Sequence, residues 1–192
     1  ACKNLGDDSE LKGKKVKEIS ALDAYYLIDS AEKILIVPGF GLAASQCQNV
    51  LKELEDILET MGKEIRYAIH PIAGRIPGHI NMVLSEAKVS YDKLWDLDKV
   101  NAMIHSFDLC IVIGANDIVN PASKDIKDSP LFGMPIIEAD RAKTVIVIKR
   151  TLNHGFSKVD NPLFYKNNTS MLLGDAKSVL YQIIKEVRSA LP

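Results

Sequence analysis

The sequence predicts an α/β domain: a doubly wound, Rossmann-like, mostly parallel sheet of about six strands with helices on both faces. Short apolar runs alternate with segments of helical periodicity along the 192 residues, which is the pattern of repeated βαβ units. The apolar run 34–37 stops at a glycine-rich turn, and a helical pattern begins immediately after it. The runs 109–113 and 144–148 also stop at turn or polar residues, as buried parallel strands do.

The first half of the chain contains an arm and the first elements of the domain. Residues 1–19 are polar, lysine-rich and without periodicity, which is typical of a flexible arm, so we place the domain at 20–192. Ser20 and Asp23 have the spacing of a capping box. The elements predicted next are a helix 20–32, a strand 33–37, a helix 42–61 that stops at Gly62, a strand 64–69, a helix 80–88, a strand 91–94 and a helix capped by Asp96 or Asp98 that ends near 105.

The second half predicts strands separated by longer loops. The elements, in order, are a strand 108–113, a long loop with a short strand at 135–138, a strand 144–148, an irregular segment 153–168, a short strand 169–173 and a helix that begins at Gly174–Asp175 and ends near 191. A loop as long as 153–168 is uncommon in a compact domain and is often a functional lid. We therefore expect this segment to cover a ligand.

Composition excludes several classes of function. The 24 basic and 25 acidic residues are balanced and form no basic stripe with aromatics, so nucleic acid is not expected as a partner. No apolar stretch has membrane-spanning length and no signal peptide is evident, so we expect a soluble chain. The cysteines and histidines show no metal-ligand spacing, which predicts free thiols in a reducing compartment and no metal site: Cys2, Cys47, Cys110, His70, His79, His105 and His154.

Four loops at the carboxyl ends of predicted strands carry the candidate site. The stretch Gly39–Ala44 matches G-x-G-x-x-A after a strand and before a helix, the pattern of a loop that binds a pyrophosphate. Gly74–Arg75, Gly114–Asp117 and Lys149–Thr151 follow later strands. Because ligands of open α/β sheets bind outside the carboxyl ends of the strands, we expect these four loops to meet at one nucleotide site.

The residue types favour NADP(H) over NAD(H). A domain that binds NAD usually has an acidic residue at the end of its second strand, and here Ala68–His70 contains none. Basic groups are present instead at Arg75 and at Lys149–Arg150, and an arginine can bind a phosphate in bidentate fashion. The usual nucleotide orientation favours Arg75 as the 2′-phosphate ligand, but composition leaves the choice between the two basic sites open.

Six segments, in order, carry a resemblance to a known family: Pro38–Ala43, His70–His79, Gly114–Pro121, Lys149–Thr151, Asn161–Phe164 and Gly174–Lys177. Together they resemble the NADP(H)-binding domain of proton-translocating nicotinamide nucleotide transhydrogenase, the third domain, in the C-terminal part of its beta subunit. The resemblance extends over residues 20–191. Departures are Phe40 where tyrosine is usual, Thr151 where serine is common, and the segment Asn153–Phe156.

The resemblance implies roles for the loops. The nucleotide lies reversed on the fold in that family, so Lys149–Thr151 would hold the 2′-phosphate and residues 155–173 would form a lid. Asp117 would lie near the nicotinamide as the catalytic residue that couples to protonation. The residues implied in NADP(H) binding are Gly39, Phe40, Gly41, Leu42, Ala43, Ile72, Ala73, Gly74, Arg75, Ile76, Pro77, Gly114, Ala115, Asn116, Asp117, Ile118, Gly133, Met134, Lys149, Arg150, Thr151, Leu152, Asn153, His154, Gly155, Phe156, Asp175 and Ala176.

The resemblance also implies partners. In the whole enzyme, hydride passes between NADP(H) and NAD(H) held on a separate domain, and a membrane-spanning domain carries the proton. The parent enzyme would be a dimer in the mitochondrial inner membrane or an equivalent energised membrane, with this soluble domain facing the matrix or cytosol. A stand-alone NADP-dependent oxidoreductase is disfavoured, because the nucleotide fold uses nearly the whole chain and leaves little of it for a separate substrate pocket. An NADP(H)-sensing module remains an alternative.

Overall fold

A single six-stranded sheet organises the computed structural model, which describes residues 14–192. Its strand order is β3-β2-β1-β4-β5-β6, and every neighbouring pair is parallel. The predicted α/β, doubly wound fold is confirmed, with a wholly rather than mostly parallel sheet. The strands are β1 (Lys33–Pro38), β2 (Glu64–Ile69), β3 (Leu94–Asp96), β4 (Leu109–Ile113), β5 (Thr144–Lys149) and β6 (Thr169–Leu173).

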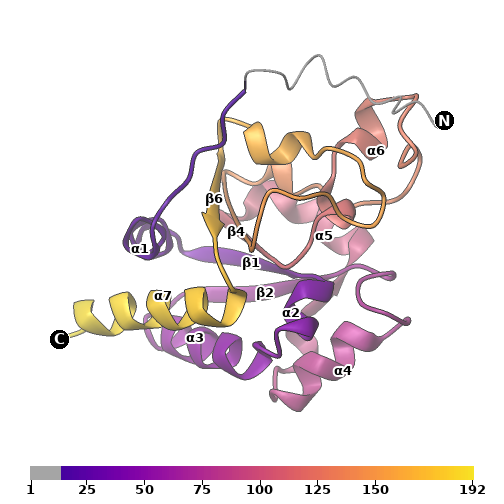
Figure 1. Cartoon of the computed structure of the whole chain (residues 1–192). Coiled ribbons are helices and arrows are strands. Elements are labelled where there is room, and N and C mark those ends of the chain that lie inside the picture. Colours follow the sequence, from indigo (N-terminus) through magenta and orange to yellow (C-terminus); the bar gives the residue numbers. More distant parts are fainter. Residues whose placement is uncertain (1–13) are drawn as a thin grey trace.

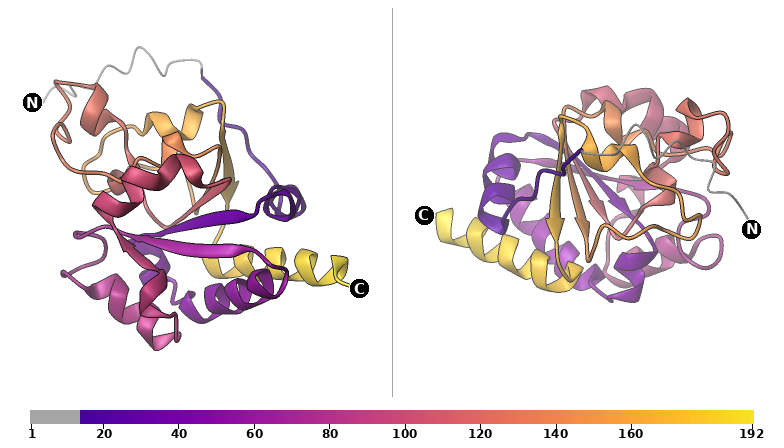
Figure 2. Two further views of the ribbon diagram at one scale, coloured as in Figure 1. Left: turned by 180° about the vertical axis from the view of Figure 1, so that it is seen from behind. Right: turned by 45° about the horizontal axis from the view of Figure 1, so that its top comes forward.

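Helices cover both faces of the sheet (Figures 1 and 2). α1, α3, α4 and α7 lie on one face, where α7 contacts both α1 and α3, while α5 and α6 lie on the other. With both faces covered, β1 and β4 are buried over nearly their whole length, which explains their unbroken apolar sequences. The helices are α1 (Ala21–Ser30), α2 (Phe40–Ala44), α3 (Gln48–Thr60), α4 (His79–Glu86), α5 (Leu97–Met103), α6 (Ala122–Asp125) and α7 (Ala176–Ala190).

The predicted helix ends are largely confirmed by hydrogen bonds. The Asp23 N–H donates to Ser20 Oγ (3.2 Å) and the Ser20 N–H donates to Asp23 Oδ2 (3.0 Å), which completes the capping box that begins α1. Asp96, rather than Asp98, caps α5, because its Oδ1 accepts from the Lys99 N–H at 2.9 Å. Gly62 follows the C-cap of α3 with φ +85°, the left-handed conformation that ends many helices.

The predicted helix 42–61 is wrong as a single element. The structure divides it into α2 and α3, and Gln46 between them has a left-handed backbone (φ +52°). The Gly41 carbonyl of α2 accepts from both the Ser45 N–H (3.0 Å) and the Ser45 hydroxyl (2.7 Å). The helical spacing of apolar residues continues across the break between α2 and α3, and for this reason the sequence pattern predicts one continuous helix.

Two predicted strands also differ from the structure. Residues 135–138 form no strand, because side-chain and loop partners occupy their backbone: the Ile137 N–H donates to the Ile118 carbonyl (2.8 Å), and Asn101 bonds both to the Ile136 carbonyl (2.8 Å) and to the Glu138 N–H (2.9 Å). The strand predicted at 91–94 lies later, as β3, and a 3₁₀ turn at Tyr91–Lys93 precedes it.

Part of the predicted arm lies against the edge of the sheet. Glu18 forms a parallel bridge with Met171 of β6, where the Ile19 N–H donates to the Met171 carbonyl (2.9 Å) and the Met171 N–H donates to the Lys17 carbonyl (2.7 Å). Residues 1–13 of the arm lie outside the described residues, and the boundary at 19/20 stays a prediction. No helix in the part of the chain that the structure describes is long and apolar enough to cross a membrane.

Candidate functional site

A cleft of about 940 Å³ lies at the carboxyl ends of the strands. Its walls come from the segments that follow β1, β2, β4, β5 and β6, so the convergence predicted for four loops is found. The strand order reverses between β1 and β4, and this switch point is where open α/β sheets bind ligands. Position and volume both suit a ligand of nucleotide size.

Glycines join the two loops at the switch point. The Gly39 N–H donates to the Ile113 carbonyl (2.9 Å) and the Gly41 N–H donates to the Gly114 carbonyl (2.8 Å). A Cβ atom on Gly39 would lie 2.4 Å from the Gly114 oxygen and 2.5 Å from the Ala115 Cβ. Gly114 itself has φ +62°, and a Cβ there would lie 2.5 Å from the Leu42 nitrogen. The glycines therefore allow the two loops to pack together. The N–H groups of Gly39 and Gly41 are already hydrogen-bonded to protein carbonyls.

His70 connects two other walls of the cleft. Its ring is buried, with Nδ1 accepting from the Ile72 N–H (3.2 Å) and Nε2 lying 2.6 Å from the Pro135 carbonyl oxygen. Since an N–H can only donate and a carbonyl can only accept, the ring is the neutral tautomer with its proton on Nε2. Burial lowers the pKa of His70, and the bond to Pro135 opposes that shift in part.

Hydrogen bonds attach the segment 153–161 to the loop after β4. Asp117 accepts from the Ser157 N–H at Oδ2 (2.9 Å) and from the Ser157 hydroxyl at Oδ1 (2.6 Å). The Asn161 side chain donates to the carbonyl of Asn116 (3.1 Å), and the Asn120 side chain donates to the Asp160 carbonyl (3.0 Å). The candidate lid and the loop that carries Asp117 therefore form one connected wall.

Among the charged residues that line the cleft in the described part of the chain, most are basic. They are Lys149, Arg150 and Lys158, against one carboxylate, Asp117. The Lys149 ammonium donates to the Asn153 carbonyl (3.3 Å); burial lowers the pKa of Lys149, and the charge of Asp117 opposes that shift. Arg150 pairs with Asp175 (3.2 Å) and is exposed. The cleft therefore has the charge of an anion site.

Comparison with known proteins decides the family. Residues 2–186 match the family model described as "NAD(P) transhydrogenase beta subunit". The NAD(P) transhydrogenase subunit beta of Rhodospirillum rubrum is 47% identical over 172 residues, which are 90% of this chain and 37% of that protein. The chain belongs to the NAD(P) transhydrogenase beta subunit family. The chain spans little more than a third of the length of the Rhodospirillum rubrum protein.

Solved structures outside the family share the fold alone. A complex of a Sir2 homologue with NAD aligns over 93% of this chain and 98% of that chain, with a TM-score of 0.59 and 11% identity. A mutant Sir2 homologue in complex with 2′-O-acetyl ADP ribose aligns over 88% of this chain and 97% of that chain, with a TM-score of 0.58 and 11% identity. At such low identity, these structures support the architecture of the transhydrogenase-family chain and nothing about its site.

The cleft brings together most of the residues predicted from sequence. Those that line it are Gly39, Phe40, Gly41, Ile72, Ala73, Gly74, Gly114, Ala115, Asn116, Asp117, Ile118, Met134, Lys149, Arg150, Thr151, Asn153, His154, Gly155, Phe156 and Ala176. Predicted residues that do not line it are Leu42, Ala43, Arg75, Ile76, Pro77, Gly133, Leu152 and Asp175. Of these, Leu42 is fully buried in the core, and Asp175 begins α7 by accepting from the Ser178 N–H.

Sequence reasoning missed several lining residues: Ala44, Ser45, Leu131, Ile148, Lys158 and Gly174. Ala44 and Gly174 lie within predicted motifs, and Ser45 and Ile148 adjoin them, so position along the chain could have identified these four. Lys158 lies within the segment 153–168 that was expected to cover a ligand, but it was not among the predicted binding residues, because its own place depends on how that segment folds.

The mouth of the cleft contains an aromatic pair. The Phe40 and Phe156 ring centroids are 6.0 Å apart, and the Arg75 guanidinium lies 5.1 Å from the Phe40 centroid. This is a cation–π contact, and Arg75 does not line the cleft. Phe40 thus connects the loop after β1 both to the segment 153–161 and to the loop after β2.

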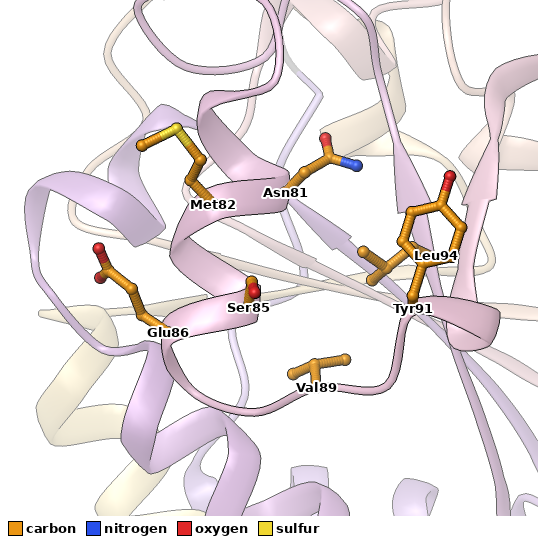
Figure 3. Close-up of a pocket in the computed structure, with 7 residues that line it drawn as sticks. All are labelled: Asn81, Met82, Ser85, Glu86, Val89, Tyr91 and Leu94. Atoms are coloured by element: carbon orange, nitrogen blue, oxygen red, sulfur yellow. The ribbon is translucent and has the colours of Figure 1, made fainter.

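A second hollow, of about 500 Å³, lies between α4 and the segment 91–94, away from the strand ends (Figure 3). Its lining includes Met82, Ser85 and Tyr91, and it contains none of the predicted site residues. Its polar lining residues include Asn81, Ser85 and Glu86, of which Glu86 alone is charged. Within the described residues no group of histidines, cysteines and carboxylates could hold a metal ion.

Proposed function

We propose that this chain binds NADP(H) in the cleft and is the NADP(H)-binding component of a proton-translocating transhydrogenase. The observation that carries the proposal is the charge of the lining: Lys149, Arg150 and Lys158 come from the end of β5 and the segment after it. No acidic residue among the described residues lines the cleft at the end of β2, where an NAD site usually has one for the ribose 2′-hydroxyl. The lining therefore suits a 2′-phosphate.

The geometry favours the end of β5 over Arg75 as the 2′-phosphate site. Lys149 and Arg150 line the cleft, whereas Arg75 does not and contacts the Phe40 ring instead. Thr151 adds a hydroxyl beside them. An arginine fork and a lysine ammonium together match the charge and acceptor geometry of a phosphate monoester. This arrangement corresponds to the reversed nucleotide orientation expected from the family.

With the 2′-phosphate at the end of β5, the nicotinamide would lie toward the loop Gly114–Asp117. The bound nucleotide supplies or accepts the hydride. In that position Asp117 would be protonated in one state of the enzyme. In the other state it would be a carboxylate that accepts two hydrogen bonds from Ser157. Its protonation would therefore change how firmly the segment 153–161 is attached to the loop after β4. We assign Asp117 the role of coupling residue on this ground.

Hydride exchange requires a second nucleotide on another domain. The structure offers large exposed apolar side chains near the mouth of the cleft: Ile72 is 60%, Ile76 59% and Phe156 88% exposed. Such exposed apolar groups are typical of a docking surface. We propose that they contact the NAD(H)-binding domain, and that a membrane-spanning domain of a dimeric parent enzyme carries the proton. A soluble domain on the matrix or cytosolic side of the membrane would meet both partners.

Hydride exchange between separated components tests the proposal. The chain is mixed with NADPH, an NAD⁺ analogue whose reduced form absorbs at its own wavelength, and a separately made NAD(H)-binding domain of the same enzyme. We expect reduction of the analogue only when all three are present. Reduction without the partner would indicate a stand-alone oxidoreductase. NADPH binding with no exchange would indicate a sensor.

A further inference from the structure

Lys158 has a backbone conformation that lysine rarely adopts. Its φ is +57°, and Gln46 and Lys88 are the only other non-glycine residues with positive φ in the described part of the chain. The Lys158 N–H donates to the Gly155 carbonyl (3.1 Å), and Ser157, the residue before it, is bonded to Asp117 through its N–H and hydroxyl. The turn is therefore fixed from both sides. Glycine would adopt this conformation without steric cost.

The side chain of Lys158 lines the cleft and is exposed. The two other cations of the lining already have protein partners: Lys149 donates to the Asn153 carbonyl, and Arg150 pairs with Asp175. The Lys158 ammonium has no hydrogen bond or ion pair among the described residues. The one carboxylate in the lining, Asp117, is occupied by Ser157. Among the charged lysine and arginine residues of the lining, Lys158 is thus the one without a protein partner within the described residues.

We propose that Lys158 binds a phosphate group of the nucleotide, as a binding residue that supplements Lys149 and Arg150. This inference rests on the proposed NADP(H) site. A strained backbone position is typical of functional sites, and here the strained residue contributes a charge that glycine, the unstrained choice, would lack. The phosphate is either the 2′-phosphate or the pyrophosphate, and the two can be distinguished by experiment.

Three substitutions at this position separate charge from backbone shape. Lys158→Gly and Lys158→Asn both suit a left-handed backbone and remove the charge, whereas Lys158→Arg keeps the charge. Lys88→Gly is the matched control, because Lys88 has φ +64° after α4, is exposed and lies outside the cleft lining. Dissociation constants for NADP⁺ and NAD⁺ are measured by calorimetry at low and high NaCl, and Tm is measured for each variant.

We expect Lys158→Gly and Lys158→Asn to bind NADP⁺ about two- to fivefold more weakly, with the larger effect at low salt, because one exposed charge contact is lost. Tm should not fall in either variant. Lys158→Arg and Lys88→Gly should bind NADP⁺ as the wild type does. A loss confined to NADP⁺ identifies the 2′-phosphate as the partner, and an equal loss for NAD⁺ identifies the pyrophosphate.

Unchanged NADP⁺ affinity in Lys158→Gly and Lys158→Asn would overturn this inference alone, provided that the wild type binds NADP⁺. Weakened binding in Lys158→Arg to the same extent as in Lys158→Gly would also overturn it, because shape rather than charge would then be decisive. A wild-type chain that binds no NADP⁺ at all would overturn the proposed function together with this inference.

Discussion

Asp117 and Ser157 are joined by two hydrogen bonds, one from the Ser157 N–H (2.9 Å) and one from its hydroxyl (2.6 Å), each to a different carboxylate oxygen. The residues lie 40 positions apart in the sequence, and each lies in a segment that lines the cleft. The pair therefore attaches the candidate lid to the loop that follows β4. Gly155 is close enough that a Cβ on it would lie 2.9 Å from the Asp117 carboxylate, so the carboxylate packs tightly against the segment.

Removing the Ser157 hydroxyl should loosen the segment 153–161. A hydrogen bond to a charged acceptor contributes roughly 1.5–3 kcal/mol, so Ser157→Ala should speed amide hydrogen exchange in this segment by at least about tenfold. NADP(H) binding should restore protection. The control is Ser189→Ala, which removes a hydroxyl bonded only within α7. Identical exchange in Ser157→Ala and the wild type would show that the pair does not hold the segment.

A methyl group on Gly39 should separate the loops after β1 and β4. Its Cβ would lie 2.4 Å from a backbone oxygen, and such overpacking costs about 1–3 kcal/mol of unfolding free energy. The contrast is Gly62→Ala, where φ is +85° and the space is open, so that backbone strain alone costs about 1–2 kcal/mol. Denaturant unfolding measures both losses, and only Gly39→Ala should also weaken nucleotide binding. Equal nucleotide affinity in the two variants would contradict a role for this packing in the site.

His70 should make stability depend on pH. Burial lowers its pKa below the ordinary value of 6.5, so below about pH 6.5 the unfolded chain takes up a proton that the folded chain does not. The contribution of His70 is therefore present above its unfolded pKa and is lost as the pH falls below it. Unfolding free energies from pH 8 to pH 5 should fall in the wild type more steeply than in His70→Asn and His70→Gln.

The two variants at His70 also separate its hydrogen bonds. Asparagine can still accept from the Ile72 N–H, and glutamine can still donate toward the Pro135 carbonyl, in place of Nδ1 and Nε2 respectively. We expect each to retain part of the stability that His70→Ala loses. A pH slope in both variants equal to that of the wild type would show that another group titrates.

The fold was predictable because the strands are buried on both faces. Continuous apolar runs such as 109–113 have few alternatives, and the capping box at Ser20 is a local signal. The wrong predictions concern segments whose conformation depends on tertiary contacts. The predicted strand 135–138 has its backbone bonded to Asn101 and Ile118, residues that no local pattern connects with it. The break between α2 and α3 lies at Gln46, which has a left-handed backbone (φ +52°), and the apolar spacing continues across it.

The site residues that directly follow strand ends could be predicted from the sequence, and those in the long irregular segment could not. Strand order brings the loops after β1, β4 and β5 together in any doubly wound sheet, so the amino-acid sequence was enough to assign Gly39, Asn116 and Lys149 to one cleft. The residue types alone left the choice between Arg75 and Lys149–Arg150 open; in the folded chain Lys149 and Arg150 line the cleft, whereas Arg75 contacts the Phe40 ring. Lys158 likewise required the folded path of the segment 153–161.

The central claim is that the end of β5 binds a 2′-phosphate, and calorimetry with NADP⁺ and NAD⁺ tests it most directly. The wild type should strongly prefer NADP⁺. Charged hydrogen bonds contribute roughly 1.5–3 kcal/mol each, with less from the exposed Arg150, so Lys149→Ala with Arg150→Ala should reduce that preference by at least about tenfold, while Arg75→Ala should leave it intact. An unchanged preference in the double variant, or its loss in Arg75→Ala, would contradict the account.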